Sequence, residues 1–194
     1  GDNMTINDTE QATIIGSDVI ASDSKGGIAI GGDDAGLPNG YSNTEIRGKG
    51  AIAIGVGAKA KADAAMSLGV FSNTTVNDGV ALGSNSTADR ASIANNKTTA
   101  YNGSDTNVAN TIKGNYGAVS VGNSNATRQI INVAAGSEDT DAVNVAQLKN
   151  NGFNVKGKDS ANADKTNLIK SGKTVEFASG NNYLKIDHTT TTNG

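Results

Sequence analysis

The sequence predicts a mainly β fold in which short parallel strands stack as a solenoid. One phrase ending in glycine occurs five times, as GIAIG, AIAIG, AMSLG, GVALG and AVSVG, starting at residues 27, 51, 65, 79 and 118. The closing glycines of the middle three copies, Gly55, Gly69 and Gly83, are 14 residues apart. Because 14 residues cannot enclose a core, each copy is expected to be one coil that is stable only when stacked on its neighbours.

Composition favours thin stacked coils over an ordinary globular core. Hydrophobic residues make up 36% of the chain and aromatic residues 4%, against roughly 45–50% apolar residues in typical soluble domains. The chain has 25 glycines but a single proline, Pro38, which suits tight turns between strands whose hydrogen bonding is uninterrupted. One chain alone buries little apolar surface, so association with further chains is expected.

Each phrase is predicted to be a short strand with large residues on one face and small ones on the other. In AIAIG, Ile52 and Ile54 alternate with Ala53, which is the period of a β-strand. A second, weaker alternation follows within the same coil at Ala58–Ala62. We therefore expect two short strands and two tight turns per coil, with the closing glycine at a turn that needs positive φ or a close backbone approach. ATIIG at 12–16 is interpreted as a further copy, one residue out of phase.

Two interruptions of the repeat are predicted to be loops, at residues 32–49 and 84–117. Insertions in solenoids emerge on one face, which is often the binding face. The first is rich in turn-forming residues, and the second is rich in Asn and Thr with isolated tyrosines. The candidate ligand-contact residues in these loops are Asp33, Asp34, Tyr41, Tyr101 and Tyr116.

Beyond the last repeat the pattern changes to that of a helix. We predict a helix over residues 141–150, with Thr140 or Asp139 as its N-cap. Val145 and Leu148 give it a narrow apolar stripe of the coiled-coil kind. Since a helix this short is marginal alone, it needs partner helices.

From residue 151 strand-like alternation returns and indicates a small β domain. The alternating apolar residues fall in four pairs, separated by glycines: Phe153 and Val155, Leu168 and Ile169, Val175 and Phe177, and Leu184 and Ile186.

The stacked AIAIG phrases, followed by RQIINVAAGSEDTDAVNVAQLK at 128–149, resemble the head and neck of trimeric autotransporter adhesins, the YadA-like family. The resemblance covers about residues 12–150, and residues 84–117 are similar to an insert often found in the last coil before the neck. It implies a left-handed parallel β-roll from each of three chains, assembled as a trimer. The domains would be a head at 1–127, a neck leading into a short coiled coil at 128–150, and a small β-rich adaptor or stalk domain, incomplete at its C-terminus, at 151–194. The trimer-forming neck residues would be Ile130, Val133, Val143, Val145 and Leu148.

The resemblance also implies a function. The chain would be a homotrimeric piece of an adhesin on the surface of a Gram-negative bacterium, held in the outer membrane by an anchor outside this sequence. It would attach to host extracellular matrix, host cells or other bacteria, through a host matrix protein, a host-cell receptor or a bacterial surface glycan or protein. The alternatives are a passive spacer of the fibre and a β-solenoid enzyme that degrades polysaccharides.

Charge and residue types weigh against other functions. The 16 Lys and Arg are balanced by 19 Asp and Glu without blocks of one sign, so nucleic-acid binding is not expected. A solenoid enzyme would need carboxylates in register on one face, but the repeats hold Ala, Ser and Thr. His188 is the only histidine and lies in a polar run, which weighs against a catalytic histidine. Gly55–Ala60 matches the dinucleotide-binding pattern G-x-G-x-x-A but lacks the βαβ unit that this pattern requires. Asp33 and Asp34 lack the repeat of calcium-binding β-rolls. We therefore expect no catalytic, cofactor-binding or metal-binding residue.

Overall fold

The computed structural model describes residues 4–32, 42–158, 161–170 and 173. Strands outnumber helices in this part of the chain, as the predicted mainly β class requires. The chain divides into two compact units, Gly1–Gln129 and Ile130–Gly194, which are described separately.

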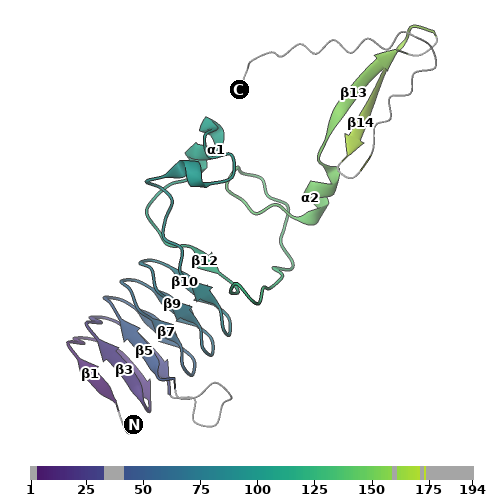
Figure 1. Ribbon diagram of the computed structural model, residues 1–194. Coiled ribbons are helices and arrows are strands. Elements are labelled where there is room, and N and C mark those ends of the chain that lie inside the picture. The colour runs from purple at the N-terminus through teal and green to yellow at the C-terminus, as the bar shows by residue number, and fades with distance from the viewer. Residues whose placement is uncertain (1–3, 33–41, 159–160, 171–172, 174–194) are drawn as a thin grey trace. The chain divides into compact units, whose positions relative to one another are not determined.

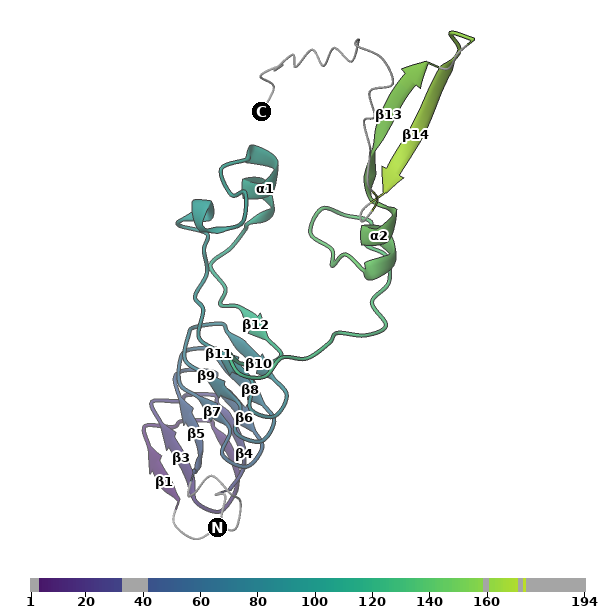
Figure 2. The ribbon, with the colours of Figure 1, turned by 45° about the vertical axis from the view of Figure 1, so that its right-hand side comes forward.

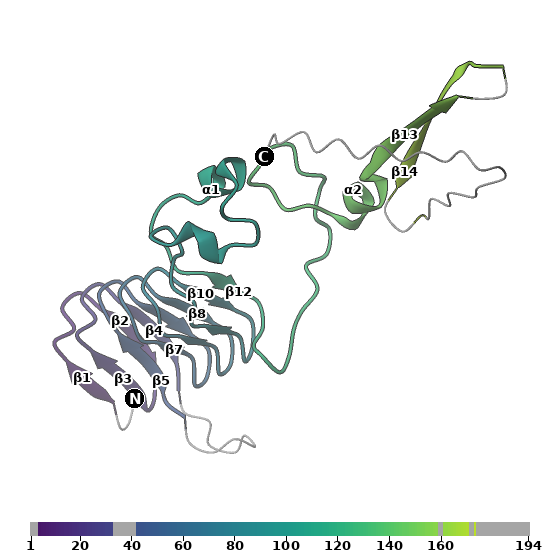
Figure 3. The same cartoon turned by 45° about the horizontal axis from the view of Figure 1, so that its top comes forward.

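In the first unit, successive strands alternate between two six-stranded sheets whose strands are all parallel (Figure 1). Sheet A has the order β1-β3-β5-β7-β9-β11, with bounds Thr5–Asn7, Val19–Ser22, Thr44–Arg47, Lys59–Ala60, Asn73–Thr74 and Thr87–Ala88. Sheet B has the order β12-β10-β8-β6-β4-β2, with bounds Val119–Ser120, Val80–Leu82, Met66–Leu68, Ile52–Ile54, Ile28–Gly31 and Thr13–Gly16. Two strands per coil are therefore present, as the sequence predicts, and Figure 3 shows the stack of coils from a second side.

The repeat keeps equivalent residues in register from coil to coil. Ala53 pairs with Ser67, and its large neighbours pair with Met66 and Leu68. The ATIIG segment also belongs to the stack, because β2 pairs with β4 along its whole length. Gly16 pairs with Gly31, so the prediction that this copy is one residue out of phase is wrong. Ile14 takes the inward position of Ala29 and packs against the core, and Ile15 is exposed on the outer side of sheet B.

Small side chains fill the space between the two sheets. The inward residues of sheet B include Ala29, Ala53, Ser67 and Ala81, and those of sheet A include Ala21, Ile46, Ala60 and Thr74; all are fully buried. The large residues of each phrase point outward instead. A 14-residue coil brings its two strands so close that Ala, Ser and Thr are the side chains that fit between most of them.

Buried hydroxyl groups join the two sheets inside the roll. Ser67 Oγ lies 2.6 Å from Lys59 O and 2.9 Å from Thr74 Oγ1, and Thr74 Oγ1 donates to Met66 O at 2.7 Å. These bonds give the buried polar atoms partners that water cannot supply there. The core of the roll is thus partly polar, and the hydroxyl groups of Ser67 and Thr74 are satisfied within it.

The closing glycines meet both requirements predicted for them. Gly55 and Gly69 have φ values of +129° and +128°. A Cβ on Gly69 would lie 2.6 Å from the carbonyl carbon of Gly83 in the next coil. Glycine is therefore needed for conformation and for space at the same position.

The two predicted insertions are shorter than their sequence bounds. Residues 32–49 contain β5, which pairs with β3 and β7 inside sheet A, so the prediction of a loop is wrong for Thr44–Arg47. Residues 84–117 likewise contain β11, the sheet A strand of its coil. What remains of the second insertion leaves the roll after β11 and returns at β12, carrying a 3-10 turn at Lys97–Thr99 and helix α1 at Thr106–Thr111 (Figure 2).

The second unit contains helix α2 at Val145–Asn150 and an antiparallel hairpin of β13, Gly152–Lys158, and β14, Asp164–Lys170. The hairpin confirms the strands predicted around Phe153 and Leu168, whereas those at Val175–Phe177 and Leu184–Ile186 lie outside the described residues. The predicted helix start is wrong: α2 begins four residues later than Asp141. Within the described ranges, no helix is both long and apolar enough to cross a membrane.

Candidate interaction surfaces

The outer side of sheet B is a continuous apolar surface, which we call the apolar face. Strands β4, β6, β8 and β10 each place two large residues there because the small residue between them points into the roll, and β2 and β12 add Ile15 and Val119. The outermost side chains remain well exposed: Leu82 is 47% exposed and Val119 67%. The apolar face consists of Ile15, Ile28, Ile30, Ile52, Ile54, Met66, Leu68, Val80, Leu82 and Val119. Exposed apolar surface of this extent marks an interaction site.

The outer side of sheet A is polar except at Ile20. The residues that follow one another down this side include Glu45, Lys59, Asn73 and Thr87, which pair in register. The two flat sides of the roll therefore differ in chemistry, and apolar association is confined to sheet B.

The second insertion is held together by its own polar contacts. Asp105 caps α1 by accepting a hydrogen bond from Asn107 N at 2.7 Å. Lys97 Nζ donates to Ala109 O at 3.0 Å, and Ser92 Oγ donates to Gly114 O at 3.3 Å. These contacts join the turn, the helix and the returning segment into one small lobe.

This lobe exposes the predicted tyrosines. Tyr101 is 99% exposed and Tyr116 is 72% exposed. Tyr116 borders a cavity of about 340 Å³ whose lining includes Arg90, Ile93 and Lys113. Tyr101 does not line that cavity, so the structure places the two tyrosines at separate points of the lobe. The other three predicted contact residues, Asp33, Asp34 and Tyr41, lie outside the described residues.

The neck segment turns its predicted apolar residues outward. Ile130, Val143, Val145 and Leu148 are 56–70% exposed, and Val133 is partly buried. A short segment that exposes so many aliphatic side chains is suited to packing against other chains rather than against itself.

Polar side chains fold the neck instead. Gln147 Oε1 accepts from Gly136 N at 3.0 Å, and Gln147 Nε2 donates to Gly136 O at 2.9 Å. Asn144 caps α2 through Gln147 N and also donates from Nδ2 to Val133 O at 3.2 Å. The predicted caps, Thr140 and Asp139, are wrong; the N-x-x-Q spacing of a capping box was the available signal for Asn144 and Gln147.

Asp141 closes the loop that precedes this helix. Its carboxylate accepts from Ser137 N at 2.9 Å and from Glu138 N at 3.1 Å. These backbone donors stabilise the ionised form and hold the pKa of Asp141 below its usual value of 3.8.

Arg128 closes the last coil of the roll. Its guanidinium donates to Ser86 Oγ at 3.0 Å, to Val121 O at 2.6 Å and to Ser84 O at 2.5 Å. The carbonyl groups of Ser84 and Val121 thus accept hydrogen bonds from Arg128 at the end of the repeat, where no further coil supplies a donor.

Comparisons with known proteins find one family model and similar adhesins. A family model described as the coiled stalk of trimeric autotransporter adhesin matches residues 129–170. The autotransporter adhesin BadA of Bartonella henselae is 48% identical over 84 residues, which cover 38% of this chain and 3% of that protein. The autotransporter adhesin EhaG of Escherichia coli O157:H7 is 39% identical over 124 residues, covering 63% of this chain and 7% of that protein. These matches support a trimeric autotransporter adhesin.

The family match gives the bounds of the stalk-like segment. It starts one residue after Arg128 and continues past Asn150 to Lys170, so it includes the β13–β14 hairpin as well as the neck. The chain spans less than a tenth of the length of either adhesin. Neither relative's name describes an enzyme.

Proposed function

We propose that this chain is the head-to-stalk part of an adhesin fibre in which three copies pack through the apolar face and the neck. The observation that carries the proposal is the outward display of aliphatic side chains on sheet B and on residues 130–148. Covering these side chains stabilises the assembly through the hydrophobic effect. The family matched at residues 129–170 is trimeric by its description, which sets the expected number of copies at three.

We propose the domain order that the family resemblance implies. Residues 1–127 form the head, a left-handed β-roll; residues 128–150 form the neck that leads into a three-stranded coiled coil; and residues 151–194 form a β-rich stalk element. The fibre is displayed on the surface of a Gram-negative bacterium and anchored in its outer membrane through a segment outside this sequence.

The second insertion is proposed as the ligand-contacting part of the head. It carries the exposed Tyr101 and Tyr116 and interrupts an otherwise regular roll. Exposed aromatic residues are enriched among the residues that dominate binding energy at interfaces. The ligand class is host matrix, a host-cell receptor or another bacterium.

Whole-cell attachment tests this proposal. The adhesin that contains this chain is displayed on a non-adherent bacterium, with residues 90–117 replaced by a short turn that leaves β11 and β12 in place. We expect attachment to surfaces coated with matrix proteins to fall while display, measured with an antibody to the stalk, stays the same. Unchanged attachment at equal display would remove the insertion as the contact surface.

A spacer function is the second candidate, and it concerns residues 129–170. The matched family model describes a stalk, and the match includes the β13–β14 hairpin. If the isolated stalk segment binds none of the matrix proteins that the full chain binds, the spacer assignment for this part stands.

A further inference from the structure

The outer side of sheet A carries a cationic cluster, which we define as Arg47, Lys59 and Lys61. Lys59 is in register with Glu45 on the neighbouring strand, and the same register places Lys61 beside Arg47. Neighbouring strands are about 4.8 Å apart, and residues two apart along one strand are about 7 Å apart. Three cations therefore share a patch of two coils.

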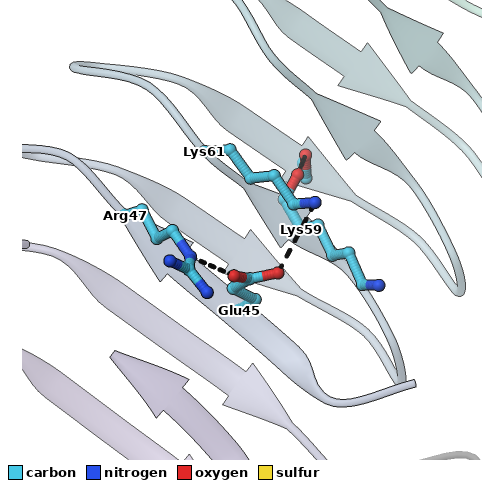
Figure 4. A network of polar contacts seen from close by, with 5 residues as sticks. Glu45, Arg47, Lys59 and Lys61 are labelled. Atoms are coloured by element: carbon cyan, nitrogen blue, oxygen red, sulfur yellow. Dashed lines mark hydrogen bonds and ion pairs between the residues drawn. The ribbon is translucent and has the colours of Figure 1, made fainter. Parts of the chain in front are cut away.

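A buried carboxylate organises this cluster. Glu45 is 6% exposed, and its carboxylate lies between Arg47 and Lys61, as Figure 4 shows. Arg47 Nε pairs with Glu45 Oε1, and Lys61 Nζ lies 3.7 Å from Glu45 Oε2. Both cationic side chains stay accessible, since their exposed fractions are 55% and 37%. Glu45 thus fixes two cations in place on the surface while cancelling one charge of the three.

The third cation is not involved in this ion pairing. Figure 4 shows Lys59 extending along the sheet away from the Glu45 carboxylate, and no ion pair is formed by Lys59 within the described part of the chain. Among the described residues of these coils, the other carboxylate is that of Asp63, which accepts a hydrogen bond from Lys49 N in a turn. In the described ranges, the outer side of the two coils therefore keeps an excess of positive charge, although the whole chain has a net charge of −3.

We propose that this cluster binds a sulfated polysaccharide. The closely spaced cations need a partner with several anionic groups within a few ångströms of one another, and sulfate groups on neighbouring sugars provide that density. A guanidinium and an ammonium group both pair well with tetrahedral oxyanions. A nucleic acid is disfavoured because described aromatic residues are absent from this side of the roll, so bases have no stacking partner.

This site goes beyond the adhesive role proposed for the insertion, and it rests on that proposal only in leaving sheet A uncovered by the apolar packing of sheet B. The polysaccharide would run across β5 and β7, where the residues of the adjoining coils, Ile20 and Asn73, are uncharged. The cluster is thus a local site and not a charged stripe along the whole roll.

Binding of the purified chain to immobilised heparin tests the inference. We expect Lys59→Gln/Lys61→Gln to weaken binding roughly 2- to 30-fold, the range for losing two solvent-exposed ion pairs. Lys25→Gln/Lys156→Gln makes the same change in net charge at two ion pairs outside the cluster and the insertion, and it should leave binding within twofold. Binding should also weaken steeply between about 0.1 M and about 1 M salt, as the screening length falls from about 10 Å to about 3 Å.

Several outcomes would overturn the proposal. Equal binding by Lys59→Gln/Lys61→Gln and the parent chain would do so, as would an equal loss in the control variant. Lys59→Gln alone provides the check against misfolding, because Lys59 forms no ion pair with Glu45. Unchanged heparin binding by this variant would also count against the site.

Other ligands test the chemistry of the partner. If single-stranded DNA bound as tightly as heparin, with the same sensitivity to Lys59→Gln, the partner would be a nucleic acid and not a polysaccharide. Hyaluronan, which carries carboxylates but no sulfate, should bind more weakly than heparin, and equal binding would refute the role of sulfate. None of these assays involves cells or the insertion, so their failure is separable from failure of the adhesive proposal.

Discussion

Leu82→Ala should weaken association of the chain without unfolding its roll. Leu82 lies in β10 on the apolar face and keeps 47% of its surface exposed in one chain. Fully burying a leucine contributes about 1.5–3 kcal/mol, so covering the exposed half contributes about 0.7–1.5 kcal/mol per copy. For three copies the loss is about 2–4.5 kcal/mol, and at about 1.4 kcal/mol per tenfold this weakens assembly roughly 30- to 1,500-fold.

Sedimentation equilibrium over a dilution series measures this change directly. Val70→Ala provides the control, since Val70 is also exposed but lies in a turn outside sheet B. The control should assemble like the parent chain. If Leu82→Ala dissociates at the same concentration as Val70→Ala, the apolar face is not the packing surface and the reasoning from exposed side chains fails.

Three further predictions concern the roll and the neck. Ala53→Leu should destabilise the roll by about 1–3 kcal/mol in thermal unfolding because the space between the sheets is full, whereas Ile54→Leu on the outer side should cost less than about 1.5 kcal/mol. Gly69→Ala should cost about 1–3 kcal/mol or more, from positive φ and the 2.6 Å approach to Gly83; Gly50→Ala, where a Cβ meets nothing within 4 Å, should cost less. The stability supplied by Asp141 should be complete above pH 3.8, its ordinary pKa, and should be lost as the pH falls through its lower pKa in the folded chain. Carbon NMR titration of the carboxylate, with Asp141→Asn as the comparison, checks this. A titration midpoint at or above pH 3.8 would contradict the prediction.

Sequence periodicity determines the coil but not which side of it is buried. The alternation of Ile52, Ala53 and Ile54 separates two faces, and it is consistent with either face turned inward. The choice follows from the distance between the two strands of one coil, which depends on turns on both sides of the phrase. In this coil that distance admits Ala53 and excludes Ile52 and Ile54. The closing glycines were predictable because conformation and close approach both act locally.

Features that depend on contacts across the sequence were harder to predict. Strand β5 was not predicted because its residues, TEIR, lack the alternation of large and small side chains. Its pairing with β3 and β7 identifies it as a strand. The helix cap was uncertain because several Asp, Thr and Asn residues precede α2, and the choice of Asn144 is fixed by Gln147, which also reaches back to Gly136. Arg47 and Lys61 likewise meet only through the register of adjacent coils.

The small core has a consequence for how the chain folds. Burying Ala and Ser side chains removes little apolar surface from water, and the hydrophobic contribution scales with that surface. Most of the large aliphatic groups lie on the outer side of sheet B, where one chain leaves them partly exposed. The roll of a single chain is therefore expected to be marginally stable, and packing of copies supplies the missing burial. Since a partner that binds only the folded state raises its apparent stability, the melting temperature should rise with chain concentration. Substitutions on the apolar face should then lower both assembly and melting temperature, whereas substitutions in the insertion should change neither.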